Sequence, residues 1–293
     1  MKNQLITLAF LLLTTVLIAQ TADQVTTSGE VTYTTKVNIH KMLKGDRSER
    51  MKKMLPEFKT IKQVLYFSET ETFFKKMKVK EDVVEGDLEG GRGSRFMRMM
   101  GGSDNDIYYT NLDDETITEQ KDFLGKTFLI SDEIEPMNWK LSGEQKTING
   151  YVCQKATLVI PKKKEEAPKK ENKAKKDKKG KKAKKEAEGR GKRRNRGPKN
   201  VVAWFTSQIP VSAGPSKFAQ LPGLVVQVEI DGGNTTIIAE NISLKNLEKG
   251  TIKAPKKGKK VTRAEFKKIQ KEKFEEMRKS RGGHGKGGRM FRH

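Results

Sequence analysis

Apolar and polar residues alternate with a period of two along much of this chain, which is the pattern of β-strands that bury one face. The alternation is clearest from Val31 to Ile39 and from Tyr151 to Ile160. Asn149-Gly150, just before the second run, is a strong signal for a tight hairpin turn. The pattern predicts strands at residues 31–39, 64–67, 72–79, 107–112, 116–120, 127–130, 139–141, 151–160, 201–205, 224–230 and 235–247.

About ten short, closely spaced strands with few helices predict a mainly β fold, either a curved antiparallel sheet or a partly closed barrel. A short helix is expected from Asp46 to Leu55, before Pro56. A second, basic and amphipathic helix is expected at about residues 262–280. Thr262-Arg-Ala-Glu265 forms a capping box there, and its apolar stripe consists of Phe266, Ile269, Phe274 and Met277.

The segment from Val201 to Glu229 is the most informative part of the chain. Two apolar, strand-like runs enclose a stretch in which Pro210, Pro215 and Pro222 forbid a helix. Pro222 presets φ, and Gly223 is free to adopt φ > 0, so Leu221 to Val225 is predicted to form a tight turn. The segment is expected to be a core hairpin with a long, rigid loop.

The same segment carries a family resemblance. Trp204-Phe-Thr-x-x-Ile-Pro-x-x-x-Gly-Pro, followed by Phe218-Ala-Gln-Leu-Pro-Gly-Leu-Val, resembles the GLPGLI family of exported Bacteroidetes proteins. Residues 139–156 resemble a second block of that family, and the likeness spans about residues 28–245. The family has no established biochemical activity. Its motif positions here are Trp204, Pro210, Gly214, Pro215, Leu221, Pro222, Gly223 and Leu224.

The hexapeptide that names the family is Gln220 to Val225 in this chain, so Gln stands at its first glycine. Glycine is the residue that adopts φ > 0 without steric cost. The replacement therefore predicts that position 220 does not require a positive φ in this chain.

An apolar run from Leu5 to Ala19 follows one lysine at the start of the chain and predicts a signal peptide, residues 1–19, cleaved after Ala19. The run is too short for a membrane span, which needs about 20 residues. No cysteine lies directly after it, so a lipoprotein anchor is not indicated. The protein is expected to be exported and not transmembrane. It would reside in the periplasm, on the outer membrane or outside the cell.

The formal net charge of +24 is confined to two segments. Residues 162–199 hold 16 Lys and 4 Arg against 6 acidic residues, and residues 253–293 hold 11 Lys and 5 Arg against 4. The first has almost no large apolar residue and is predicted to be a disordered insertion in a single domain of residues 20–252. Both segments are expected to be appendages that leave the stability of the domain unchanged.

Basic segments without aromatic residues bind charge and not base sequence. The expected partners are anionic lipid, lipopolysaccharide or another polyanion, besides another envelope protein, and not a specific nucleic acid sequence. The candidate binding residues are Lys175, Lys176, Lys178, Lys179, Lys181, Lys182, Arg193 and Arg194.

Candidate catalytic chemistry is sparse. His40 and the single cysteine, Cys153, lack a surrounding signature, and the adjacent acids Asp113, Asp114 and Glu115 fit a solvated turn. No cofactor is implied. A copper site is a third hypothesis, because thioether ligands suit Cu(I); its ligands would come from Met97, Met99, Met100, His284, Met290 and His293.

The sequence therefore favours a non-enzymatic exported envelope protein, a β-rich binding or scaffold module whose basic segments associate with anionic surfaces. The alternative is a carrier that holds a lipid or another apolar ligand on the concave face of the sheet.

Overall fold

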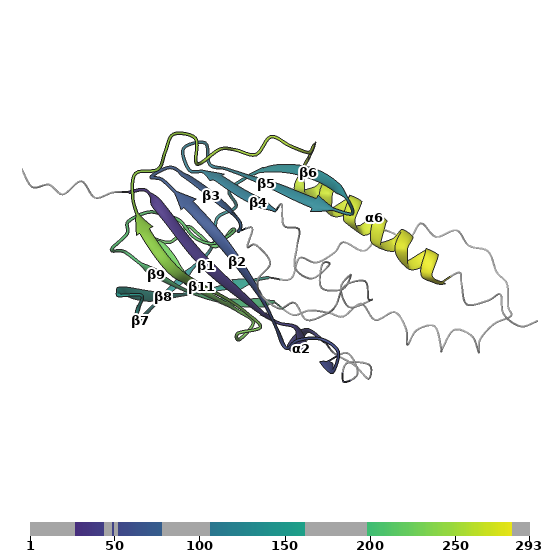
Figure 1. Cartoon of the computed structure of the whole chain (residues 1–293), viewed down its shortest axis with the longest axis horizontal. Helices are drawn as coiled ribbons and strands as arrows, with labels where there is room; N and C mark the ends of the chain where they lie inside the picture. The colour runs from purple at the N-terminus through teal and green to yellow at the C-terminus, as the bar shows by residue number, and fades with distance from the viewer. Residues whose placement is uncertain (1–26, 44–48, 50–51, 78–105, 162–197, 283–293) are drawn as a thin grey trace, which may run out of the picture.

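The alternating segments of the sequence pair into one β-sheet in the computed structural model, which describes residues 27–43, 49, 52–77, 106–161 and 198–282 (Figure 1). The strands are β1 (Gly29–Asn38), β2 (Phe58–Phe67), β3 (Glu71–Lys76), β4 (Ile107–Asn111), β5 (Thr116–Phe123), β6 (Lys126–Glu133), β7 (Lys140–Ile148), β8 (Tyr151–Ile160), β9 (Lys199–Thr206), β10 (Leu224–Ile230), β11 (Thr235–Leu244) and β12 (Lys259–Val261).

The strand order is β12-β6-β5-β4-β3-β2-β1-β11-β10-β9-β8-β7. Every neighbouring pair is antiparallel except β12 and β6, which run parallel. The sheet ends at β12 and β7, so it is open and not a barrel. The prediction of a mainly β curved sheet is confirmed, and the sheet adds one strand, β12, to the eleven predicted segments.

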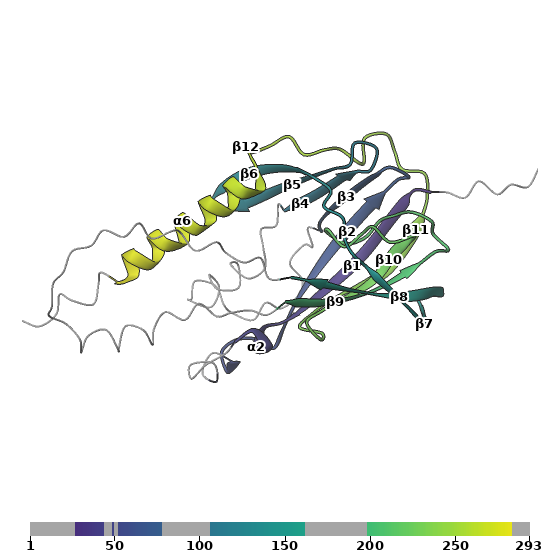
Figure 2. The same cartoon turned by 180° about the vertical axis from the view of Figure 1, so that it is seen from behind.

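β1 is the seam between two series of strands. β2 to β6 follow it on one side in chain order, and β11 to β7 follow it on the other in reverse order. Figures 1 and 2 show β3 to β6 and the β7–β9 region on opposite sides of β1, β2 and β11, so the sheet is strongly curved. Its core joins Val31, Leu65 and Phe74 with side chains of β8 to β10.

The Lys-rich tract interrupts this sheet at the end of one hairpin. Ile160 at the end of β8 lies directly opposite Lys199 at the start of β9. Residues 162–197, which include all eight predicted binding residues, lie outside the described part of the chain. The tract therefore leaves and re-enters the sheet at two adjoining positions.

The C-terminal helix α6 (Arg263–Gly282) lies where the capping box predicts it. The backbone N–H of Glu265 donates to Thr262 Oγ1 at 3.2 Å, and that of Thr262 donates to Glu265 Oε2 at 2.8 Å. Phe266 is buried in a satellite cluster with Phe128 and Ile130 of β6. This part of the C-terminal segment is integrated into the fold, which corrects the expectation that it is an appendage.

Two shorter features complete the described structure. The helix α2 (Ile39–Met42) extends β1, and Asn38 Oδ1 caps it by accepting from the backbone N–H of Lys41 at 2.8 Å. Half of the helix predicted from Asp46 to Leu55 falls outside the described residues; in the described half, Lys53 N–H donates to Glu49 O at 3.2 Å, the spacing of a helical turn. Among the described residues no helix is both long and apolar enough to cross a membrane.

Candidate binding surface

Six of the eight residues of the family motif are buried, whereas Pro210 and Pro222 are exposed. The loop between β9 and β10 turns tightly around its prolines, since Val211 N–H donates to Ile209 O at 2.8 Å and Gly223 N–H donates to Leu221 O at 2.8 Å. Such three-residue turns are γ-turns, with Pro210 and Pro222 at their centres. The apolar side chains of the loop are buried in the main core: Ile209, Val211, Ala213, Phe218 and Leu221.

The start of β10 holds this loop in place. The backbone N–H groups of Leu224 and Val225 donate to Ile209 O at 3.1 Å and Ala213 O at 2.9 Å. The carbonyl of Val225 accepts from the buried Tyr33 hydroxyl at 2.6 Å. Burial raises the pKa of Tyr33 far above its ordinary value, so the phenol remains a neutral donor.

Two motif glycines are required because the backbone passes too close for a side chain. A Cβ on Gly214 would lie 1.9 Å from Phe218 O, and a Cβ on Gly223 would lie 2.1 Å from Thr206 O. Gly223 also has φ +151°, as the sequence predicts for this turn.

Gln220 contradicts the prediction made for its position, because its φ is +65°. The side chain offsets this conformation with two hydrogen bonds to the segment before β7. Its Oε1 accepts from Met137 N–H at 2.8 Å, and its Nε2 donates to Glu135 O at 3.0 Å. Trp139 Nε1 donates to the adjacent Ala219 O at 2.9 Å, so the two sequence blocks that carry the resemblance meet here.

A lysine covers the ring of Trp204, the tryptophan of the family motif. Lys146 Nζ lies 4.1 Å from the ring centroid of Trp204, close enough for a cation–π contact. The same ammonium group donates to Gln227 Oε1 at 3.0 Å. The motif thus positions core packing and strand contacts, and its loop occupies space that the carrier hypothesis assigned to a ligand.

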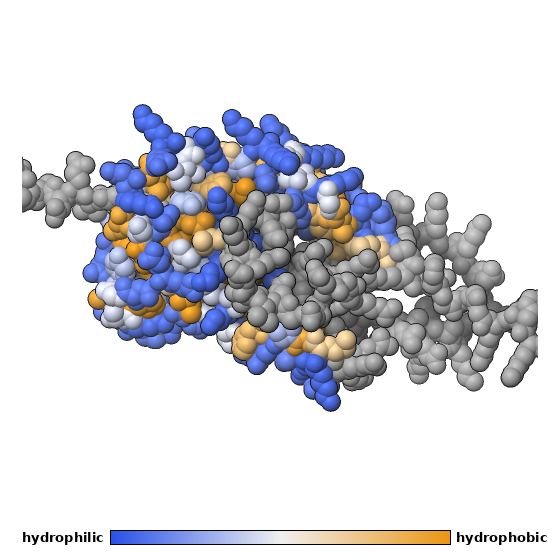
Figure 3. Space-filling view, viewed as in Figure 1, coloured by the Kyte–Doolittle hydropathy of each residue, from blue (hydrophilic) through white to orange (hydrophobic). Residues whose placement is uncertain are grey.

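The main charged surface of the described structure lies on the segment that leads into α6 and on α6 itself. Between residues 253 and 273 the acidic residues are Glu265, which caps the helix, and Glu272. Figure 3 shows hydrophilic side chains projecting along the margin where this segment runs. The basic strip consists of nine exposed lysines: Lys253, Lys256, Lys257, Lys259, Lys260, Lys267, Lys268, Lys271 and Lys273.

An ion-pair network fixes the basic strip to the sheet. The guanidinium of Arg263 donates to Glu119 Oε1 at 2.6 Å and to Asp132 Oδ2 at 2.8 Å, and Lys121 Nζ lies 2.8 Å from Glu119 Oε2. The side chain of Glu119 is only 5% exposed. Burial alone would raise its pKa, but Arg263 and Lys121 hold the pKa of Glu119 below its ordinary value.

The nearest hollow to this strip is a shallow cleft of about 420 Å³ between α6, β12 and β6. Thr118 and Ser131 lie on its floor, and their hydroxyl oxygens are 3.4 Å apart. Leu129, Pro255 and Lys260 also line it. The cleft is open and mixed in polarity, unlike an enclosed lipid cavity.

The residues considered for catalysis make contacts that stabilise the fold. His40 lies on α2, directly after β1, and its Nε2 is 2.8 Å from Leu55 O. Cys153 is buried on β8, four strands away from β1 in the sheet. Burial raises the pKa of the Cys153 thiol, which disfavours the reactive thiolate. Asp113 and Asp114 are exposed in the β4–β5 turn, as predicted, and their backbone N–H groups donate to Asn111 Oδ1.

The candidate copper ligands all lie outside the described residues. Within the described ranges, no group of three or more His, Cys, Asp or Glu side chains is arranged to hold a metal ion. The copper hypothesis therefore stays a prediction from the sequence.

Comparison with known proteins adds a family match to this mainly β chain with an open, curved sheet. A family model described as "Protein of unknown function (Porph_ging)" matches residues 139–227. The match starts at Trp139 and covers the motif loop, the region that carries the resemblance seen in the sequence. No curated protein matches the chain.

Among solved structures, the chain is similar to PNGF-II in two crystal forms, of space groups C2 and P21. The identity is 14% in both, with TM-scores of 0.47 and 0.45. The similarity covers 83% of this chain and 32% of PNGF-II, so the chain spans about a third of the length of those structures.

Proposed function

We propose that this protein is a non-enzymatic, exported protein of the bacterial envelope, a β-rich binding or scaffold module that associates with anionic surfaces through its basic segments. The observation that carries the proposal is the basic strip on residues 253–273. Its nine lysines are exposed on an element that Arg263 and Phe266 fix to the sheet. A fixed array of like charges attracts a polyanion and releases its counterions.

The composition of the undescribed segments extends this positive charge. Residues 162–197 are rich in Lys and Arg, and residues 283–293 add Lys286, Arg289 and Arg292. Each lysine near an anionic membrane contributes about 1 kcal/mol of attraction, which salt weakens. The summed attraction is sufficient for surface association without a structured ligand pocket.

The filled interior supports a scaffold role over the carrier alternative. The loop at residues 209–223 packs its side chains into the same core as Val31, Leu65 and Phe74. A carrier would need that volume for its ligand. Copurifying lipid in native mass spectrometry would favour the carrier instead.

The proposal is tested with the mature chain, residues 20–293, on vesicles containing anionic lipid and on heparin. Retention should fall steeply as salt rises from low to moderate concentration, and neutral vesicles should retain little protein. Retention that does not depend on salt, or none at low salt, overturns the proposal.

A matched pair of variants locates the interaction. Gln replaces Lys256, Lys267 and Lys268 in the strip variant, and Lys36, Lys53 and Lys140 in the control, all of which are exposed. Both variants lose three positive charges. The strip variant should bind at least about tenfold more weakly than the control, since each lysine near the surface contributes about 1 kcal/mol. Equal losses would show that only the net charge matters and that the strip has no special role.

A further inference from the structure

The β5–β6 hairpin carries an unusual residue at its tip. Phe123 pairs with Lys126, so Leu124 and Gly125 form a two-residue turn with φ of 51° and 77°. Positive φ at both central residues defines a type I′ turn, for which Asn-Gly and Asp-Gly are the favoured sequences. A leucine in this backbone conformation is strained, because its side chain gains no local hydrogen bond there.

The β7–β8 hairpin of the same chain shows the favoured alternative. Asn149 and Gly150 form its turn with φ of 51° and 82°. The two turns share a backbone conformation and differ in the first residue. Folding therefore gives no reason for leucine at position 124, and a role at the surface would explain it.

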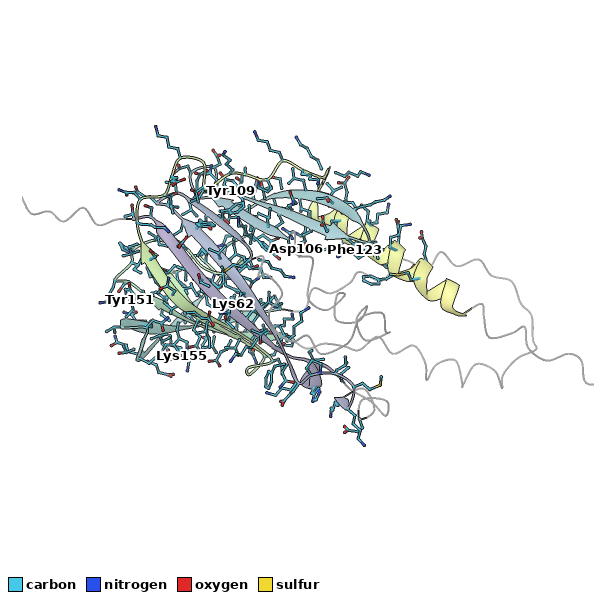
Figure 4. All side chains as sticks on the ribbon, viewed as in Figure 1. Lys62, Asp106, Tyr109, Phe123, Tyr151 and Lys155 are labelled. Carbon is cyan, nitrogen blue, oxygen red and sulfur yellow. The ribbon has the colours of Figure 1, made fainter. Side chains whose placement is uncertain are left out.

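Leu124 is also one of the most exposed large apolar residues of the described structure, at 57%. Phe274 of α6, exposed at 47%, contacts Phe123, the residue before Leu124, with ring centroids 5.7 Å apart. Figure 4 labels Phe123 at the end of β5 next to α6, and Figure 3 shows apolar residues gathered at this end. We call Leu124, Phe123 and Phe274 the apolar tip.

The tip rests on a packed base. Phe123 also contacts Phe266 at 6.1 Å between centroids, and Phe266 packs on Phe128 at 5.2 Å. α6 starts at Arg263, bonded to Asp132, and runs back along β6 to the hairpin turn. The exposed side chains are thus held in place by two elements rather than by a free loop.

Exposed lysines lie close to the apolar tip in sequence, together with Glu272, Glu275 and Glu276, which flank Phe274. Lys126 follows the turn directly and is exposed, and Lys271 lies one helical turn before Phe274. Lys267 is exposed a further turn back, whereas Lys273 pairs with Glu276 at 2.7 Å. An exposed apolar group bordered by lysines matches the boundary between the acyl chains and the anionic headgroups of a bilayer.

We infer that the apolar tip inserts into the interfacial region of an anionic lipid bilayer while the surrounding lysines contact the headgroups. The inference rests on the proposed association with anionic surfaces and identifies the surface as lipid. Heparin offers charge alone, so the tip should add affinity on vesicles and not on heparin. Charge complementarity favours this occupant over a second copy of the chain, which would present lysines to lysines.

The test is Leu124→Asn in the full mature chain. Asparagine suits the turn, as Asn149 does, so the variant should be as stable as the wild type or more stable. Binding to vesicles of phosphatidylglycerol and phosphatidylcholine should weaken about tenfold, the expected effect of losing the burial of one leucine. Retention on heparin should be unchanged. The control is Leu141→Asn, since Leu141 on β7 is 59% exposed and should have no effect on vesicle binding.

A second variant measures insertion directly. The fluorescence that Leu124→Trp adds to the wild-type emission should shift to shorter wavelength on vesicles, and brominated lipid should quench it. Unchanged vesicle binding of Leu124→Asn, or no shift for Leu124→Trp, overturns the inference and leaves the proposed function standing. Loss of self-association in Leu124→Asn with vesicle binding intact identifies a second copy as the occupant. Failure of the wild type to bind both vesicles and heparin at low salt instead overturns the proposed function.

Discussion

Gln220 holds the backbone of Met137, 83 residues earlier in the chain, through a 2.8 Å hydrogen bond that its side-chain oxygen accepts. The amide nitrogen of the same side chain donates to Glu135 O at 3.0 Å. One polar side chain therefore ties the motif loop to the segment entering β7 while its own backbone has a φ of +65°.

Replacement of Gln220 separates the contribution of its two side-chain hydrogen bonds from the cost of its positive φ. Gln220→Ala keeps the positive φ and loses both hydrogen bonds, so it should lower the free energy of unfolding by about 2 kcal/mol. Gln220→Gly loses the same bonds but relieves the backbone strain, so it should cost about 1 kcal/mol. Urea unfolding measures both. An alanine variant as stable as the glycine variant would show that the strain at this position is negligible.

The motif glycines should tolerate no side chain. In Gly223→Ala the new Cβ would meet Thr206 O, so either the loop or β9 must shift, at a cost of about 3 kcal/mol or more. Gly232→Ala is the control, because Gly232 has φ +64° and open space around it. It should cost about 1 kcal/mol from the backbone alone. Thermal unfolding compares the two, and equal losses would mean that the close approach does not matter.

Much of the sheet could be predicted from the sequence because its strands alternate locally and the Asn149-Gly150 turn has a distinctive signal. β12 could not be predicted, because Lys259-Lys260-Val261 has no apolar alternation and forms a strand only through its parallel pairing with β6. Similarly, the stripe on α6 indicated a helix but not its partner. Phe128 is 138 residues away in sequence from Phe266, and only the folded sheet brings them together.

The candidate site was less accessible to sequence reasoning. The predicted binding residues lie in the undescribed Lys-rich tract, whereas the described basic strip lies in a segment expected to be an appendage. The Leu124-Gly125 turn was missed because leucine does not signal a type I′ turn. The available signal was the position of Gly125 between two alternating runs, one of which ends just before Leu124 while the other starts after Gly125.

The Glu119 network predicts a dependence of stability on pH. Because the folded state lowers the pKa of Glu119, its contribution is fully present above the unfolded value of about 4.3 and is lost as pH falls through the folded value. Thermal unfolding should show Glu119→Gln to be less stable than the wild type by about 3 kcal/mol at pH 7, since it removes the buried anion that Arg263 and Lys121 share and leaves Arg263 with Asp132 alone.

The difference between Glu119→Gln and the wild type should shrink as the pH falls below about 4. Glu133→Gln, at an exposed position on β6, is the control and should change neither stability nor its pH dependence. A constant difference at all pH values would contradict the assignment of this pH dependence to Glu119.

Excision of the Lys-rich tract tests its independence from the fold. Because Ile160 faces Lys199, replacing residues 161–198 with Asn-Gly should close a β8–β9 hairpin directly. The shorter loop should raise the free energy of unfolding by about 2 kcal/mol through lower closure entropy. Calorimetry should show a single cooperative transition, and its collapse would mean that the tract contributes to the folded core.

The position of β1 in the sheet also sets the order in which the chain can assemble. β2 to β6 can add to β1 one after another as they leave the ribosome. β11 must wait until about 200 further residues have emerged before it can take the other edge of β1. During that interval β7 to β10 can pair with one another, but the free edges of β1 and β10 are exposed to misassembly, so chaperone demand should peak late in synthesis.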